Sequence, residues 1–562
     1  MDRSTTHDVP TYHDDDTRYP DNMKMSSDDS SDTADDLDSL ELNRINTYRL
    51  QQKSTVGSTR GPLPREQWLP MGAGKEYPPL LPAPENYVVE FDGSDDPMHP
   101  YNWSILRRTF LVCVLCYGTF VASFASAVFS AAIATVSQEF NVSSEVGSLG
   151  VTLYVLGFAA GPTMWAPASE LIGRRWPLCI GLFGCGIFTV ACGAAKDIQT
   201  IMLCRFFGGF FAASPVSIVP AVFADLFNNA QRGAVMSIFC MAVFIGPFAA
   251  PFVGGFIATS DLGWRWTMYI SAIMIFSGFA LVLFFLDESY APVILVRKAA
   301  IIRRQTHNWG IHAKQDEVEV EIKELLRNNF MRPIKMLISE PILLLISLYI
   351  SFIYGLIYAL LGAYPVVFQG VYGMSMGVGG LAFVGLIIGE LVGGVYILFL
   401  QSSYARKLAA NGDKPIPEWR LPPAIVGAVA FTGGMFWFGW AGYKASTHWM
   451  APVSSGVLTG FGIFCIFLQC FNYIVDCYPT LAASTIAANT ILRSAVGCAF
   501  PLFSRQMMEN LGVQWAGTML GCIAAVMIPI PVVFKAYGPW LRAKSKLACS
   551  PIYDVEKKSY DV

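Results

Sequence analysis

Residues 109–133 read TFLVCVLCYGTFVASFASAVFSAAI, a run that holds no Asp, Glu, Lys or Arg. A helix needs about 20 mainly apolar residues to cross the hydrocarbon core of a bilayer. Similar runs recur along the chain, and together they predict twelve membrane-spanning helices. We expect these helices at residues 109–133, 147–168, 176–195, 200–223, 234–258, 266–286, 340–369, 376–401, 421–441, 449–475, 484–507 and 514–535.

The composition agrees with an all-α polytopic membrane protein. Hydrophobic residues make up 53% of the 562 residues and charged residues only 14%, against roughly 25% charged residues in an average soluble domain. A soluble protein this apolar would expose large patches and aggregate. The net charge of −3 gives no basic field for nucleic acid. Most cysteines lie inside apolar runs, where they behave as small hydrophobic residues.

The polar segments divide the chain into five parts. Residues 1–108 begin with many acids, serines and threonines, which predicts a disordered acidic tail. Residues 287–339 are rich in charge and predict a central loop between two groups of six spans, 109–286 and 340–535. Residues 536–562 form a second tail. Two six-helix halves joined by a long inner loop are typical of alternating-access transporters.

Basic residues set the expected orientation. Pairs such as Arg107–Arg108 and Arg174–Arg175 fall in loops that would be cytoplasmic if both termini were cytoplasmic. We therefore expect a multi-pass protein of the plasma membrane with both termini and the central loop inside. Asn141 begins the sequon Asn-Val-Ser and would lie in the first outer loop, where glycosylation is topologically possible.

A charged motif follows the second expected span. It reads Ala166-Pro-Ala-Ser-Glu170-Leu-Ile-Gly173-Arg174-Arg175. An acid, a glycine turn and paired arginines form a cluster that can hold the second helix against its neighbours in one state and release it in another. The alternative is a tight loop that obeys the positive-inside rule and has no gating role.

Two charges lie deep inside expected spans. Arg205 opens the stretch Arg-Phe-Phe-Gly-Gly in the fourth span, and Glu390 lies in the middle of the eighth. Charges at this depth are costly and are functional candidates by default. Arg205 could instead extend toward the membrane surface. Glu390 is suited to carrying a proton or contacting a cation, or it could be a protonated structural acid bonded to a neighbouring helix.

The fifth span reads Gly246-Pro247-Phe-Ala-Ala-Pro251-Phe-Val-Gly254-Gly255. Glycines spaced along one face let another helix approach closely. Each proline removes a backbone hydrogen bond and permits bending. The same face could also serve packing alone.

These motifs resemble those of the major facilitator superfamily, and within it the fungal drug:proton antiporters with twelve spans. The stretches Asp96-Pro97-Met-His-Pro100 and Asn472-Tyr473-Ile-Val-Asp476 resemble that group as well. The resemblance implies the major facilitator fold with two six-helix halves. It also implies a gating motif at Glu170, Gly173, Arg174 and Arg175, a role of Arg205 in proton coupling, and an antiporter motif at Gly246, Pro247, Pro251, Gly254 and Gly255.

Aromatic and amide side chains are the expected substrate contacts, because rings accept flat or cationic apolar molecules with loose geometry. Such residues at helical spacing also serve packing or contact lipid. The candidates are Tyr354, Tyr358, Tyr364, Gln369, Phe471, Asn472 and Tyr473.

The expected function is proton-coupled efflux of amphipathic small molecules, such as antifungal drugs, toxins, polyamines or secondary metabolites. The expected partners are the substrate, protons and the lipid bilayer. Alternatives are an importer or facilitator of a small solute and a non-transporting sensor with the same fold. The sequence lacks the HExxH pattern and the GxxxxGK[ST] pattern. We therefore expect no enzyme activity, no metal, no cofactor, no nucleotide and no nucleic acid.

Overall fold

A computed structural model describes a large part of the chain. The described residues are 69–72, 75, 87–93, 95–317, 322–412, 416–478, 481–545 and 547. Most of the predicted N-terminal tail, residues 318–321 of the central loop and residues 548–562 lie outside this description.

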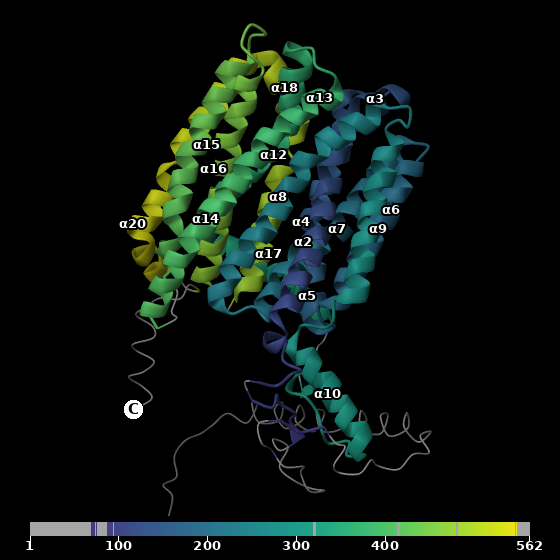
Figure 1. Cartoon of the computed structure of the whole chain (residues 1–562), viewed down its shortest axis with the longest axis vertical. Coiled ribbons are helices and arrows are strands. Elements are labelled where there is room, and N and C mark those ends of the chain that lie inside the picture. The colour runs from purple at the N-terminus through teal and green to yellow at the C-terminus, as the bar shows by residue number, and fades with distance from the viewer. Residues whose placement is uncertain are drawn as a thin grey trace, which may run out of the picture. The chain divides into compact units, whose positions relative to one another are not determined.

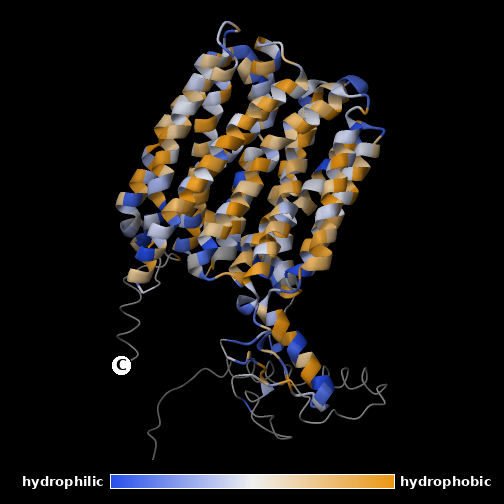
Figure 2. Ribbon diagram, viewed as in Figure 1, coloured by the Kyte–Doolittle hydropathy of each residue, from blue (hydrophilic) through white to orange (hydrophobic). Residues whose placement is uncertain are grey.

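The described residues contain twelve helical spans that are long and apolar enough to cross a membrane, which confirms the predicted fold class. The helices run side by side (Figure 1), and hydrophobic residues dominate their middle parts (Figure 2). The spans begin and end within a few residues of the predicted bounds or extend beyond them. The eighth span, for example, continues through polar residues to Ala410.

The first six spans are built from eight α-helices. They are α2 (Ile105–Ala127) with α3 (Ile133–Glu139), α4 (Ser144–Ala160) with α5 (Pro162–Leu171), α6 (Arg175–Ala194), α7 (Ile198–Leu226), α8 (Asn229–Thr259) and α9 (Arg265–Phe285). The central segment carries α10 (Ala291–Thr306) and α11 (Ile322–Ser339).

The last six spans follow the same plan. They are α12 (Pro341–Pro365), α13 (Met376–Gly380) with α14 (Val384–Ala410), α15 (Leu421–Gly442), α16 (Met450–Cys477), α17 (Ala482–Gly497) with α18 (Phe500–Leu511), and α19 (Val513–Met527) with α20 (Pro529–Lys544). All twelve spans belong to one compact unit, and the other described unit contains Leu69 and Ile301–Ile311.

The first span is broken toward its C-terminal end. α2 ends at Ala127, the short 3₁₀-helix η4 covers Val128–Ala132, and α3 resumes the helix. A change from α- to 3₁₀-helix leaves some backbone carbonyls without their usual partner. The eleventh span has a similar break before Pro501, which cannot donate a backbone hydrogen bond. Both breaks adjoin the interface between the two groups of six spans.

Residues preceding the first span pack against the start of the central segment. The ammonium of Lys298 is buried, donates to the backbone oxygen of Glu90 at 3.0 Å and lies 3.5 Å from a carboxylate oxygen of Asp96. Burial alone would raise the pKa of Asp96, but hydrogen bonds from the backbone N–H groups of Asp92 and Met98, together with Lys298, hold that pKa below its usual value. The Asp96 motif therefore anchors this segment to α10.

Candidate transport pathway

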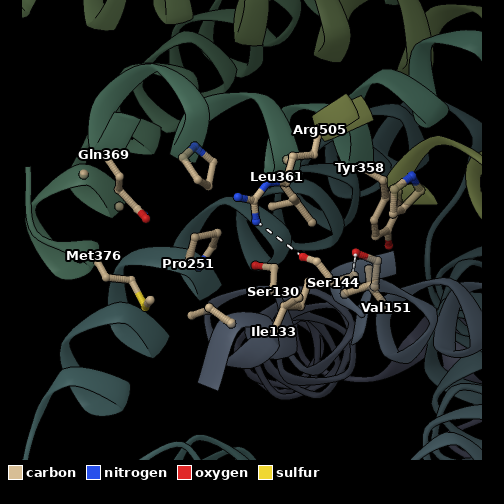
Figure 3. Close-up of a pocket in the computed structure, with 18 of the residues that line it drawn as sticks. Ser130, Ile133, Ser144, Val151, Pro251, Tyr358, Leu361, Gln369, Met376 and Arg505 are labelled. Atoms are coloured by element: carbon tan, nitrogen blue, oxygen red, sulfur yellow. Dashed lines mark hydrogen bonds between the residues drawn. The ribbon is translucent and has the colours of Figure 1, made fainter. Parts of the chain in front are cut away.

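Two cavities lie between the two groups of six spans. The first, called here the α3-side cavity, has a volume of about 110 Å³. Figure 3 shows that its wall combines residues of the first, second and fifth spans with residues of the seventh, eighth and eleventh. The Arg505 guanidinium donates to the Ser144 hydroxyl at 3.4 Å, and Gln506 donates to Glu145 at 2.9 Å. These contacts join α18 to α4 beside the cavity.

The second, called the α5-side cavity, has a volume of about 200 Å³. It lies toward the other end of the same helices, because α5 and the C-terminal ends of α7 and α16 contribute its wall. Residues lining it include Ser169, Glu170, Arg174, Ser217, Asp225, Arg232, Arg420, Phe471, Asn472, Asp476 and Thr490.

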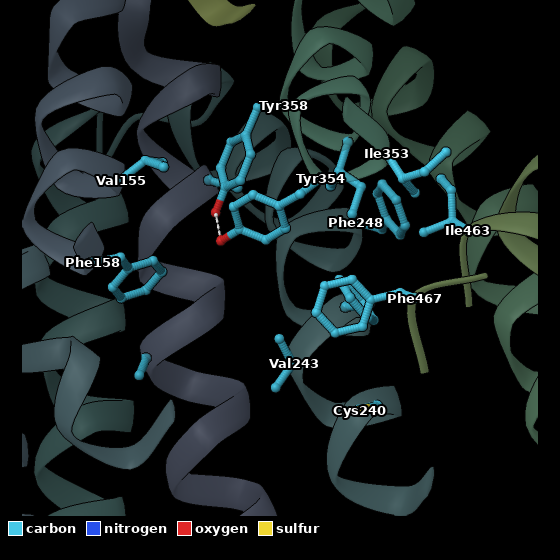
Figure 4. Packing of buried hydrophobic residues seen from close by; sticks show 14 of the residues in the cluster. Val155, Phe158, Cys240, Val243, Phe248, Ile353, Tyr354, Tyr358, Ile463 and Phe467 are labelled. Carbon is cyan, nitrogen blue, oxygen red and sulfur yellow. Dashed lines mark hydrogen bonds between the residues drawn. The ribbon is translucent and has the colours of Figure 1, made fainter. Parts of the chain in front are cut away.

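A buried layer of side chains separates the two cavities. Along the second span, Val151 of α4 lines the α3-side cavity and Pro162 of α5 lines the α5-side cavity, with Val155 and Phe158 between them. Along the seventh span, Tyr358 lines the α3-side cavity and Tyr354 lies one turn away from it. Figure 4 shows Val155, Phe158, Tyr354 and Tyr358 in this region, with the hydroxyls of the two tyrosines facing each other. We call this central layer Val155, Phe158, Phe244, Phe248, Tyr354, Tyr358, Phe467 and Arg493, all of them buried.

Two contacts at the central layer cross between the halves, Ser126–Tyr358 and Phe244–Phe467. The Ser126 and Tyr358 hydroxyls lie 3.1 Å apart, and the Tyr358 and Tyr354 hydroxyls lie 3.3 Å apart. The Phe244 and Phe467 rings meet edge to face at 4.6 Å. A solute moving from one cavity to the other must therefore displace or pass between these groups.

Arg205 lies in the interior of the bundle rather than at its surface, with 2% of its area exposed. Its guanidinium donates to the backbone oxygens of Gly150, Ala125 and Ser126 at 2.8, 2.8 and 2.9 Å. The last two oxygens belong to the end of α2, where the break at η4 frees them. The Arg205 side chain thus stabilises the broken first span and links α7 to α2 and α4.

Glu390 is fully buried in α14. Neither carboxyl oxygen has a hydrogen-bond partner within the described part of the chain. One turn away, an added Cβ at Gly394 would touch Met241 of α8, and one at Gly393 would lie 3.2 Å from the Phe464 ring of α16. A buried carboxyl group without a partner is costly in its charged form, and this cost keeps Glu390 a candidate for proton coupling.

The predicted gating motif forms a cluster at the α5 end. The Arg174 guanidinium donates to Asp225 at 3.0 Å and to the Ser169 hydroxyl at 2.8 Å. Glu288 accepts from the backbone N–H of Arg174 at 2.8 Å. Gly173 has φ +98°, and an added Cβ would collide with Glu288. The acid that pairs with Arg174 is therefore Asp225.

The other motif residues have different partners. Glu170 lines the cavity, and its backbone oxygen accepts from Gln315. Arg175 donates to the backbone oxygen of Leu283 at 2.7 Å, which ties the motif to the end of α9.

The second half carries a matching charge cluster that the sequence analysis did not single out. Arg420 donates to Asp476 at 3.0 Å, and Arg542 donates to Glu418 at 3.0 and 3.1 Å. All four side chains are nearly buried. The signal in the sequence was the acid Glu418 and the arginine Arg420, which directly precede the predicted ninth span. Their partners lie too far along the chain to be paired by spacing.

The Gly-Pro stretch forms the close contacts of α8. An added Cβ at Gly246 would lie 2.8 Å from the backbone nitrogen of Phe124 in α2, and one at Gly254 would lie 3.2 Å from Val128. On the other side, a Cβ at Gly255 would lie 2.8 Å from the backbone oxygen of Met376 in α13. Pro247 is buried beside these glycines and Pro251 lines the α3-side cavity. The stretch therefore packs α8 against both halves.

The predicted substrate contacts are distributed unevenly. Tyr358 and Gln369 line the α3-side cavity, whereas Phe471 and Asn472 line the α5-side cavity. Tyr354 belongs to the central layer. Tyr364 and Tyr473 line neither cavity: Tyr364 stacks on Phe438 with centroids 5.0 Å apart, and Tyr473 packs against Phe534. Because Tyr473 follows Asn472 by one helical position, its side chain points about 100° away.

Asn141 is exposed in the turn between α3 and α4 and has φ 52°. This left-handed conformation is one that asparagine tolerates. Ser143 of the same sequon caps α4 by accepting from the backbone N–H of Val146.

Comparison with known proteins agrees with the arrangement of two six-span halves around a central pathway. The family model described as Major Facilitator Superfamily matches residues 115–501. The chain belongs to the major facilitator superfamily. A multidrug transporter of Candida albicans, FLU1, is 45% identical over 496 residues, which are 88% of this chain and 80% of that protein. The multidrug transporter TPO1_2 of Candida glabrata is 44% identical over 482 residues, 86% of this chain and 83% of that protein.

A solved structure shows the same fold. The xylose transporter XylE from E. coli, in a partially occluded inward open conformation, superimposes with a TM-score of 0.52 and 18% identity. The match covers 75% of this chain and 98% of that one. The prediction of a major facilitator fold, made from the motifs, is confirmed. This member of the superfamily therefore has relatives among fungal multidrug transporters.

Proposed function

We propose that this member of the major facilitator superfamily is a proton-coupled exporter that moves amphipathic small molecules out of the cell across the plasma membrane by alternating access. In this proposal both termini and the α5 end are cytoplasmic, and the α3 end faces outward. The names of the two Candida relatives, both multidrug transporters, support multidrug transport as the class of activity.

The observation that carries the proposal is the pair of cavities divided by the central layer. Each cavity is lined by both halves, so a rocking motion that widens one end of the interface narrows the other. The Ser144–Arg505 contact joins the two halves and can hold the α3 end closed. At the α5 end, the Arg174–Asp225 pair lies within the first half and the Arg420–Asp476 pair within the second, and each stabilises its own half's wall of the α5-side cavity. Substrate would enter from the α5 end and leave at the α3 end.

Proton coupling is assigned to Glu390, with Arg205 holding the structure through which the coupling acts. Neither carboxyl oxygen of Glu390 has a hydrogen-bond partner among the residues that the structure describes. The Arg205 guanidinium, in contrast, donates to three carbonyl oxygens and lies over an aromatic ring. A carboxyl group that gains and loses a proton changes the charge at the α8–α14–α16 junction. That change would favour different packings of the two halves.

The test of coupling compares Glu390→Gln and Glu390→Ala in a yeast strain lacking its own exporters. Wild type should confer resistance to some of a panel of toxic amphipathic compounds, and a protonophore should abolish export while ATP is maintained. Glu390→Gln keeps shape but cannot titrate, so it should lose proton-driven export in sealed vesicles while still binding substrate. Full proton-driven export by Glu390→Gln would remove this residue from the mechanism. ATP-driven export without a pH gradient would contradict the proposed energy source.

The proposed topology is tested at the central segment. An epitope inserted at Gly310 should be labelled only after the cells are permeabilised, and any glycan should disappear in Asn141→Gln. Labelling of the Gly310 epitope in intact cells would contradict cytoplasmic placement of this segment.

A further inference from the structure

A second buried arginine lies on the pathway itself. Arg493 is in α17, and only 5% of its area is exposed. Along the eleventh span, Thr490 lines the α5-side cavity and Pro501 lines the α3-side cavity. Arg493 therefore lies one turn from the first of these, within the central layer that a transported molecule must cross.

The contacts of Arg493 differ from those of Arg205. Arg205 donates to three carbonyl oxygens, whereas Arg493 has no hydrogen bond or ion pair with any residue that the structure describes, and its Nε is buried without a partner. Its guanidinium carbon lies 4.6 Å from the Tyr354 ring centroid and 5.1 Å from that of Phe467. Rings stabilise a cation through their faces, but they offer no lone pair to the N–H groups of the guanidinium.

An arginine in this state is incomplete without an acceptor. Burying a charge costs free energy unless it is paired and hydrogen-bonded, and the planar guanidinium matches a carboxylate through two parallel hydrogen bonds. The nearest rings, Tyr354 and Phe467, would meanwhile contact a flat apolar body. The site thus combines one anion-binding group with aromatic walls.

We propose that Arg493 binds the carboxylate of the transported molecule, and that the substrates of this protein include amphipathic organic anions with a flat apolar body. This assignment rests on the proposed transport function, because it names the class of substrate that the pathway carries. The buried Glu390 does not occupy this position, because the two side chains form no ion pair in the structure.

Fluorescein and rhodamine 123 provide a matched pair of probes, because they share a xanthene ring and differ in charge. Binding is measured by fluorescence anisotropy on the purified full chain, so that the result does not depend on proton-driven transport. Wild type should bind fluorescein, and Arg493→Gln should weaken that binding by about ten-fold or more. Rhodamine 123 should bind both proteins with similar affinity.

Two further variants make the result specific. Arg493→Lys keeps the charge but lacks the planar fork, so its fluorescein affinity should fall between those of wild type and Arg493→Gln. Arg406→Gln removes an exposed arginine at the end of α14 and should leave fluorescein binding unchanged. Gel filtration and thermal unfolding confirm that each variant is folded.

The proposal is overturned if wild type does not bind fluorescein, if Arg493→Gln binds it as tightly as wild type, or if both probes lose affinity equally. Export of rhodamine 123 from vesicles carrying a pH gradient is measured separately. If wild type does not export rhodamine 123 but binds fluorescein in an Arg493-dependent way, the proposed proton-coupled export is contradicted and the anion site is still supported.

Discussion

Arg205→Ala should abolish transport and destabilise the folded protein. The substitution removes three hydrogen bonds from a charged donor, each contributing about 1.5–3 kcal/mol, and leaves the backbone oxygens of the buried residues Ala125, Ser126 and Gly150 without this donor. Arg205 then no longer stabilises the break in the first span. The Ser126 hydroxyl, which lies next to this break, would lose its position beside the Tyr358 hydroxyl. Transport per molecule in the membrane and the thermal unfolding temperature should both fall.

Arg205→Lys separates charge from geometry. A single ammonium cannot reach three carbonyls on two helices at once, so this variant should be impaired although it remains charged. Arg265→Ala is the matched control, because Arg265 pairs with Glu139 at a half-exposed site, where an ion pair contributes about 0–1 kcal/mol. Wild-type transport and stability in Arg205→Ala would contradict the role given to this side chain.

Gly246→Leu and Gly255→Leu should reach the membrane but lose transport. A Cβ at either position would approach backbone atoms of α2 or α13 to 2.8 Å, and backbone cannot move aside as a flexible side chain can. Since α8 contacts both halves through these glycines, separating the helices would prevent the interface from closing. Pro247→Leu should also impair transport, because it restores a backbone N–H and stiffens the helix.

Gly433→Leu is the control for added bulk. Gly433 lies in α15, is exposed, and has nothing within 4 Å of a built Cβ, so leucine there would face lipid. Transport of each variant is divided by its abundance in the membrane. Normal transport by Gly246→Leu and Gly255→Leu would show that close approach at α8 is dispensable.

The twelve spans were predictable because lipid imposes a length and an apolar composition on each helix separately. The family followed from short motifs such as Gly173-Arg174-Arg175, whose residues are neighbours in the chain. The hydrogen-bond and ion-pair partners of these residues could not be predicted from the sequence in this way. Asp225 and Glu288 meet the motif only through packing of three spans, and Arg420–Asp476 joins residues far apart in sequence.

The cavity walls show the same limit. Sequence spacing could not tell that Asn472 faces a cavity whereas Tyr473 packs against α20, because that depends on how α16 is rotated in the bundle. Arg205 and Glu390 were recognised by the cost of burying charge, but their opposite states, one saturated with acceptors and one without a partner, required the structure.

The central claim is that the two cavities open alternately on opposite sides of the buried central layer. Ser130 and Ser217 line the α3-side and α5-side cavities respectively, and each can be replaced by cysteine conservatively in a background without other reactive cysteines. The most direct measurement is the rate at which a membrane-impermeant thiol reagent modifies each cysteine, with and without a pH gradient and substrate. The account predicts reciprocal changes, with Ser130→Cys modified faster whenever Ser217→Cys is modified more slowly. Rates that rise together, or that do not respond to the gradient and substrate, would contradict alternating access in this protein.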